Sequence, residues 1–223
     1  MYRINWSDFL EELNLTQRDV QAMLSILIAI FAGTMLIALA IYLLHAVGVY
    51  KMAKSAGVEN AWLAFIPIVN VLPFGQIAEK YVKRDGTKSA KFGVILLVLQ
   101  LVGSALAFLM LFFCFRGIAS MIGTVINAAD PAQITPEEIL SPLIPVFLLY
   151  MPCIGLALAL TIVRYVALWR IFCIFDYSNA TLFTVLCVLF GGLLEAIFLF
   201  VLRNRQPVFD YRERLNLFTQ NIG

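Results

Sequence analysis

Charged residues are scarce in this chain. They make up 13% of its 223 residues while hydrophobic residues make up 62%, whereas soluble globular domains carry about 25% charged residues. The net charge is only +2, so the strongly basic surface typical of nucleic-acid-binding proteins is missing. The composition therefore predicts a membrane protein, with no nucleic acid among its partners.

Metal-binding and catalytic motifs are missing as well. The four cysteines lie in or beside apolar segments without CxxC spacing, so we interpret them as small buried hydrophobic residues: Cys114, Cys153, Cys173 and Cys187. There is one histidine, and the HExxH, GxSxG and glycine-rich phosphate-loop patterns do not occur. The sequence thus predicts a protein that is not an enzyme and that uses no cofactor and no metal.

Three uncharged segments are long enough to cross a membrane. They cover residues 20–50, 92–115 and 141–163, and about 20 apolar residues suffice to span the hydrocarbon core. The residues before the first segment include Glu11, Glu12 and Asp19, whereas a cleavable signal peptide begins with basic residues. We therefore predict an all-α polytopic membrane protein with three full spans and a retained first helix.

The chain resembles itself at a distance of 119 positions. This shift places residues 38–85 on residues 157–204 without a gap, with ten identical pairs among 48. The polar matches carry most weight, because leucine-rich segments match by chance: Lys51 with Arg170, Asn60 with Asn179, Gln76 with Glu195, and Arg84 with Arg203. We predict two parallel repeats, over 38–85 and 157–204, joined by a helix over 91–126.

Two shorter apolar segments, 60–78 and 177–202, carry helix breakers near their middle. The breakers are Pro67, Asn70 and Pro73 in the first and Gly191 and Gly192 in the second, and the shift places Pro73 on Gly192. A half-helix of about ten residues rises about 15 Å, which reaches the middle of a hydrocarbon core of about 30 Å. We therefore predict two re-entrant helical hairpins that break at the same place.

The distribution of basic residues predicts the orientation. Read as full spans, the two short segments would put Lys51 on the opposite side from Lys80, although positive residues in short loops gather in the cytoplasm. With hairpins, all of the 16 Lys and Arg residues lie in or near the cytoplasm except Arg3, Arg18 and Arg116. The chain is then one integral domain of the inner membrane with its N-terminus outside, an interfacial helix over 1–19 and a cytoplasmic tail over 205–223.

A short motif follows the first long segment. Trp62, Ala64, Ile66, Pro67 and Asn70 form the pattern W-x-A-x-I-P-x-x-N. This pattern resembles short bacterial inner-membrane proteins of unassigned role, and the likeness covers roughly residues 50–80. The resemblance implies a bacterial membrane protein and transfers no catalytic residues, and the second copy lacks both the tryptophan and the proline.

Four polar residues in the apolar segments are candidate site residues: His45, Gln76, Arg164 and Glu195. Intramembrane ionisable groups are costly and mark candidate functional sites. Glu195 follows the second break and is expected near mid-membrane, where an ion pair with Arg164 would hold the hairpin. The alternatives are a proton or cation site with Gln76, or a solvated surface position. His45 and Arg164 can alternatively extend to the interface.

Two functions remain open at this point. The first is a non-catalytic accessory or structural subunit that binds membrane lipid or helices of other membrane-protein subunits. The second is a small channel or transporter with Glu195 and Gln76 at the repeat interface. The first is favoured because Glu195 is the one acidic residue in the apolar segments, and transport paths usually display more polar groups.

Overall fold

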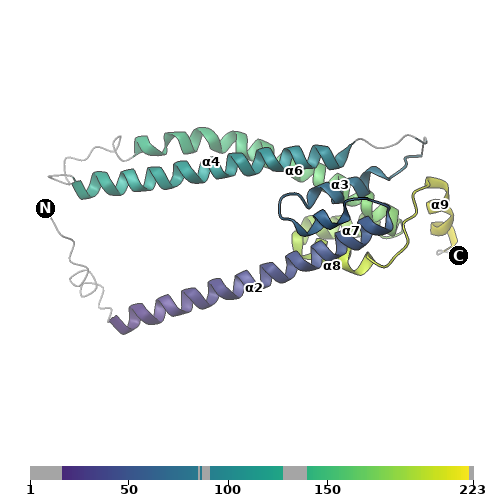
Figure 1. Ribbon diagram of the computed structural model, residues 1–223, viewed down its shortest axis with the longest axis horizontal. Coiled ribbons are helices and arrows are strands. Elements are labelled where there is room, and N and C mark those ends of the chain that lie inside the picture. The colour runs from purple at the N-terminus through teal and green to yellow at the C-terminus, as the bar shows by residue number, and fades with distance from the viewer. Residues whose placement is uncertain (1–16, 85, 87–90, 128–139, 221–223) are drawn as a thin grey trace. The chain divides into compact units, whose positions relative to one another are not determined.

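The computed structural model describes residues 17–84, 86, 91–127 and 140–220. Over these residues the fold is all-helical and contains no β-strand (Figure 1). The elements in chain order are α2 Gln17–Ser55, η1 Ala61–Phe65, α3 Val71–Glu79, α4 Phe92–Asn127, η3 Ser141–Leu143, α6 Ile144–Phe175, α7 Ala180–Phe190, α8 Gly192–Leu202 and α9 Tyr211–Gln220. The predicted all-α class is confirmed.

Three helical segments are long and apolar enough to cross a membrane: Gln21–Ser55, Phe92–Thr124 and Ser141–Phe175. Segments of 33 to 35 residues rise about 50 Å, well beyond a hydrocarbon core of about 30 Å. Three helices that could span a membrane are therefore present at the predicted places, and α4 occupies the stretch predicted to connect the repeats.

The chain divides into two compact units. Unit 1 comprises Met1–Leu39 and Leu109–Tyr150, and unit 2 comprises Ala40–Phe108 and Met151–Gly223. In unit 1, Gly117 of α4 faces Pro142 and Leu143 at close range. The part of α2 in unit 1 exposes large apolar side chains around its circumference, among them Leu27 and Phe31. A helix that is apolar all round is typical of a membrane environment.

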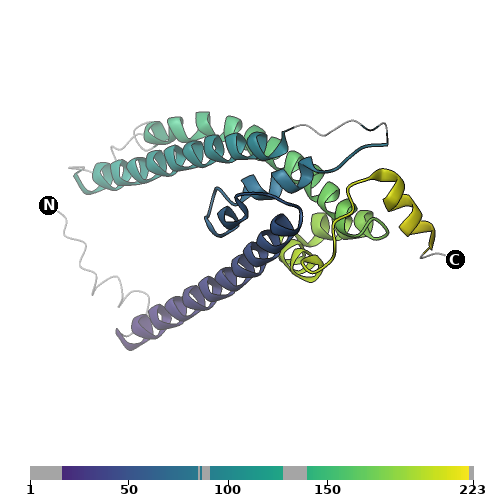
Figure 2. The ribbon, with the colours of Figure 1, turned by 45° about the vertical axis from the view of Figure 1, so that its right-hand side comes forward.

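Unit 2 contains the hydrophobic core. Its fully buried residues come from the second half of α2, from α3, from the last turns of α6 and from α8: Val49, Met52, Ile77, Leu168, Ile171, Phe172 and Leu199. Figures 1 and 2 show the second half of α2 ending among α3, α7 and α8. The core thus forms where the short helices meet the ends of the long ones.

The first predicted hairpin differs from its expected form. Its first arm is only the five-residue 3-10 helix η1, and the chain turns at residues 66–70, with Ile68 at a φ of 73°. Pro67 forces Ile66 into an extended conformation and so ends η1. Pro73 instead lies in the first turn of α3, where no backbone N–H is needed. The prediction that both copies break at the same place is therefore wrong.

The second hairpin matches the predicted local form. Helices α7 and α8 have 11 residues each and contact one another. They are joined at Gly191, whose φ of 68° and ψ of −154° fall in a region open essentially to glycine alone. Each arm rises about 16 Å, about half of a hydrocarbon core. The entry of this hairpin into a membrane and its return stay a prediction.

The chain ends are described only in part. Most of the predicted interfacial helix over 1–19 lies outside the described residues, as do residues 128–139 of the external connection. In the predicted tail, the N–H of Val208 donates to the carbonyl of Ile174, and α9 follows. The tail therefore packs against the end of α6.

Candidate functional site

Glu195 lies in the first turn of α8, and its side chain is 3% exposed. Its Oε1 atom accepts a hydrogen bond from Nη2 of Arg164 at 2.8 Å and lies 3.2 Å from Nε2 of His45. His45 belongs to α2 and Arg164 to α6. One buried carboxylate oxygen thus joins three helices, and we call these residues the carboxylate triad.

A glycine explains how α2 and α8 come close enough to form this triad. A Cβ atom on Gly48 would lie 2.8 Å from the carbonyl carbon of Leu199. Gly48 follows His45 by about one helical turn, and Leu199 follows Glu195 by about one turn. The two helices therefore run parallel here, and their close approach brings His45 to Glu195. Small residues serve the same purpose in membrane helix packing generally.

An aromatic ring covers the triad from the side of α3. Phe74 is 2% exposed, its ring stacks on His45 at a centroid distance of 6.3 Å, and Arg164 Cζ lies 6.0 Å from its centroid. Electrostatic attraction is stronger where water is excluded, and an unpaired charge is correspondingly costly there. The carboxylate thus contacts Arg164 and His45 beneath an apolar cover.

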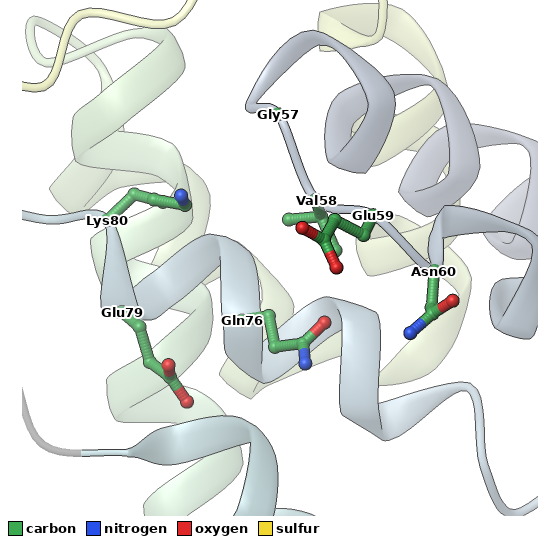
Figure 3. Close-up of a pocket in the computed structure, with 7 residues that line it drawn as sticks. All are labelled: Gly57, Val58, Glu59, Asn60, Gln76, Glu79 and Lys80. Atoms are coloured by element: carbon green, nitrogen blue, oxygen red, sulfur yellow. The ribbon is translucent and has the colours of Figure 1, made fainter.

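Gln76 lies away from the triad. It lines a pocket of about 260 Å³ together with Gly57, Val58, Glu59, Asn60, Glu79 and Lys80, and no hydrogen bond between Gln76 and Glu195 is found among the described residues (Figure 3). The buried face of α3 carries Phe74, Ile77 and Ala78, so Gln76 is turned outward. The structure therefore does not bring the two predicted members of a transport site together.

The pocket around Gln76 has mixed charge. Figure 3 shows the side chains of Glu59, Gln76 and Lys80 extending into the space between the 57–60 loop and α3. The Glu79 carboxylate accepts the backbone N–H of Gly93 at 2.8 Å, which ties α3 to the start of α4. No group of three His, Cys, Asp or Glu residues that could hold a metal is found within the described part of the chain.

A second group of buried polar residues was not singled out from the sequence. Arg214 of α9 is 1% exposed and donates to the carbonyls of Phe209, at 3.0 Å, and Val82, at 2.6 Å. Its guanidinium lies over the ring of Tyr81, which also lies near Arg170. The sequence predicted only a cytoplasmic tail over 205–223, and the structure shows that Arg214 of this tail is inserted into the protein. The available sequence signal was the run from Phe209 to Arg214, which holds two aromatic residues and two arginines within six positions.

None of the protein-family models, curated proteins or solved structures compared with the chain matches it. The observations that bear on its function are therefore the long apolar helices and the carboxylate triad.

Proposed function

We propose that this chain is a non-catalytic integral membrane protein that serves as an accessory or structural subunit and binds lipid and the helices of partner subunits. The observation that carries this proposal is the carboxylate triad. Arg164 of α6 and His45 of α2 contact the Glu195 carboxylate of α8 at 2.8 Å and 3.2 Å, and the ring of Phe74 covers the triad. Such an arrangement supports a fixed packing of α2, α6 and α8 better than it supports an ion path.

The re-entrant arrangement of α7 and α8 belongs to the same proposal. Helix α8 runs parallel to α2 where Gly48 meets Leu199, so the end of α8 lies toward the end of α2. Because α7 and α8 form a helical hairpin, α7 starts on that side as well. The inner-membrane location and the external N-terminus rest on the basic residues and on the motif beginning at Trp62.

The proposed topology predicts the labelling of single cysteines. Replacing Ser55, Ser89 or Gln206 by cysteine in a cysteine-free background should give proteins that react with an impermeant thiol reagent only from the cytoplasmic side. The reason is that basic residues flank all three positions: Lys54, Lys88, Lys91 and Arg205. Labelling of positions 55 and 89 from opposite sides would show that residues 60–78 cross the membrane.

A small channel or transporter is the competing function, and flux through liposomes decides between the two. We expect the purified protein to give proton, Na⁺ and K⁺ flux no greater than that of protein-free vesicles, because Glu195 is engaged by two donors. Glu195→Gln should leave this background unchanged. A wild-type flux that disappears in Glu195→Gln would overturn the structural role and establish transport.

Extraction from the native membrane tests the accessory role itself. In a mild non-ionic detergent the protein should migrate with other membrane subunits in a complex larger than its own 25.0 kDa mass. Migration as a lone chain in its detergent micelle at every detergent concentration would contradict the proposal.

A further inference from the structure

Two arginines enclose an aromatic group at the end of α6. Arg214 Cζ lies 4.3 Å from the Tyr81 ring centroid, and Arg170 Cζ lies 5.7 Å from the same centroid and 4.4 Å from that of Phe92. The ring of Trp169 packs on Tyr81 at 5.8 Å. Unit 2 therefore places two guanidinium groups around one tyrosine ring, and we call Arg170, Arg214 and Tyr81 the arginine cluster.

The guanidinium groups of this cluster have donors without acceptors. Nε and Nη1 of Arg170 and Nε of Arg214 are buried and find no hydrogen-bond acceptor in the protein. A buried donor left without an acceptor destabilises the fold, and more so when the group is charged. The aromatic faces offset part of this cost, but they do not replace an acceptor.

The cluster also lacks a counter-charge. Within the described residues, the ion pairs join Glu195 to His45 and Arg164 and join Asp176 to Arg205, and no carboxylate lies within 4.0 Å of Arg170 or Arg214. Burial raises the pKa of Tyr81 above its ordinary value of 10.0, so the phenol is neutral at physiological pH and supplies no negative charge. A buried Arg214 beside a half-buried Arg170 is unfavourable without an anion, which indicates that an anionic group completes the cluster.

The surroundings indicate where that anion comes from. Trp169 and Tyr81 are the residue types that gather at the membrane interface. Exposed basic side chains flank the cluster along the connection from α3 to α4: Lys80, Lys83, Arg84 and Lys91. Arg170 itself is only half-buried, so the cluster has an open side. Basic pockets of this kind at the cytoplasmic ends of helices bind lipid headgroups.

We propose that Arg170 and Arg214 bind the phosphate of an anionic membrane lipid, with Tyr81 and Trp169 beside the headgroup. Planar guanidinium groups match phosphate oxygens through paired N–H donors. This inference rests on the proposed membrane role, because it needs the end of α6 to lie at the headgroup level. It does not depend on the carboxylate triad, which is formed by other residues: His45, Arg164 and Glu195.

The test is lipid binding by the purified full-length protein in a neutral detergent. Native mass spectrometry and thermal unfolding are recorded with phosphatidylglycerol, with phosphatidylcholine and with inorganic phosphate. Phosphatidylglycerol should bind and raise the unfolding midpoint, whereas the other two should do so far less. Arg170→Gln and Arg214→Gln should each weaken phosphatidylglycerol binding about tenfold or more, since a charge-assisted hydrogen bond contributes about 1.5–3 kcal/mol.

Arg212→Gln is the matched control, because this arginine lies in the same helix and is exposed. It should keep wild-type phosphatidylglycerol affinity.

Should Arg214→Gln fail to fold, Arg170→Lys keeps the positive charge but loses the planar donor set, and it should also lose affinity. Equal affinity in wild type, Arg170→Gln and Arg170→Lys overturns the lipid site. Equal stabilisation by phosphatidylcholine or by inorganic phosphate overturns the choice of an anionic lipid. None of these results bears on flux or on complex size, so the proposed function is tested separately.

Discussion

Removing the Arg164 charge from the Glu195–Arg164 pair is expected to lower the free energy of unfolding by about 3 kcal/mol, and removing the Glu195 charge is expected to lower it by less. Glu195→Gln leaves the Arg164 guanidinium without its counter-charge, although this side chain is 39% exposed and can turn outward. Arg164→Gln leaves a carboxylate that is 3% exposed with His45 as its remaining known partner, so it should be the more damaging change. Unfolding in mixed detergent micelles with increasing SDS measures both losses.

The double variant shows whether Glu195 and Arg164 stabilise the protein as a pair or independently of each other. When both partners are neutral, no charge is left unpaired, so Glu195→Gln with Arg164→Gln should cost less than the two single losses added together. Glu213→Gln, which neutralises an exposed carboxylate in α9, is the matched control and should change stability by less than about 0.5 kcal/mol. If the loss of unfolding free energy in the double variant equals the sum of the two single losses, the pair does not hold α6 to α8.

The sequence was sufficient to identify the residues of the triad, because ionisable groups in long apolar runs are rare and must find partners. It pointed to Glu195 and Arg164 as a pair and named His45. It could not predict that His45 and Arg164 would meet the same oxygen atom, because that depends on the approach of α2 to α8. Gly48 permits this approach, and nothing in the local sequence says which helix it will face.

The misplaced break in the first hairpin has a local cause. Three breakers occur within 67–73, and the alignment drew attention to Pro73 because it coincides with Gly192. Proline and glycine act differently, since proline is compatible with the first turn of a helix and glycine supplies a positive φ. Pro67 stops η1, while Pro73 begins α3. Residues that align between the two copies therefore do not have the same backbone conformation.

Gln76 lines a pocket that does not include Glu195, and the unequal arms of the two predicted hairpins account for this. The repeat alignment assumes that equivalent residues face a common interface, but the arms differ in length: η1 has five residues, whereas α7 has 11. In α3, Phe74 and Ile77 occupy the buried face, and this sets the outward direction of Gln76. A helix of nine residues is too short for its hydrophobic periodicity to predict which way Gln76 points.

Gly75 of α3 lies in close backbone contact with the start of α4, and this contact gives the second large prediction. A Cβ atom on Gly75 would lie 2.5 Å from both Cα and N of Gly93 and 2.7 Å from the carbonyl carbon of Phe92. These are backbone atoms, so no side chain can rotate away to make room. Gly75→Ala should therefore push α3 from α4 and strain the Glu79 hydrogen bond to Gly93, lowering the free energy of unfolding by about 3 kcal/mol, the upper end for overpacking.

Gly155→Ala in α6 is the control for this prediction, because no atom lies within 4 Å of the position its Cβ would take. There the added methyl should be neutral or stabilise the helix by up to about 1 kcal/mol, since alanine favours helix more than glycine does. Both variants are compared with wild type by SDS unfolding in the same detergent. The contact between α3 and α4 requires the two substitutions to have opposite or clearly unequal effects. If Gly75→Ala is as stable as Gly155→Ala, these helices are not in backbone contact, and Gly75 has no role in placing α3 against the core.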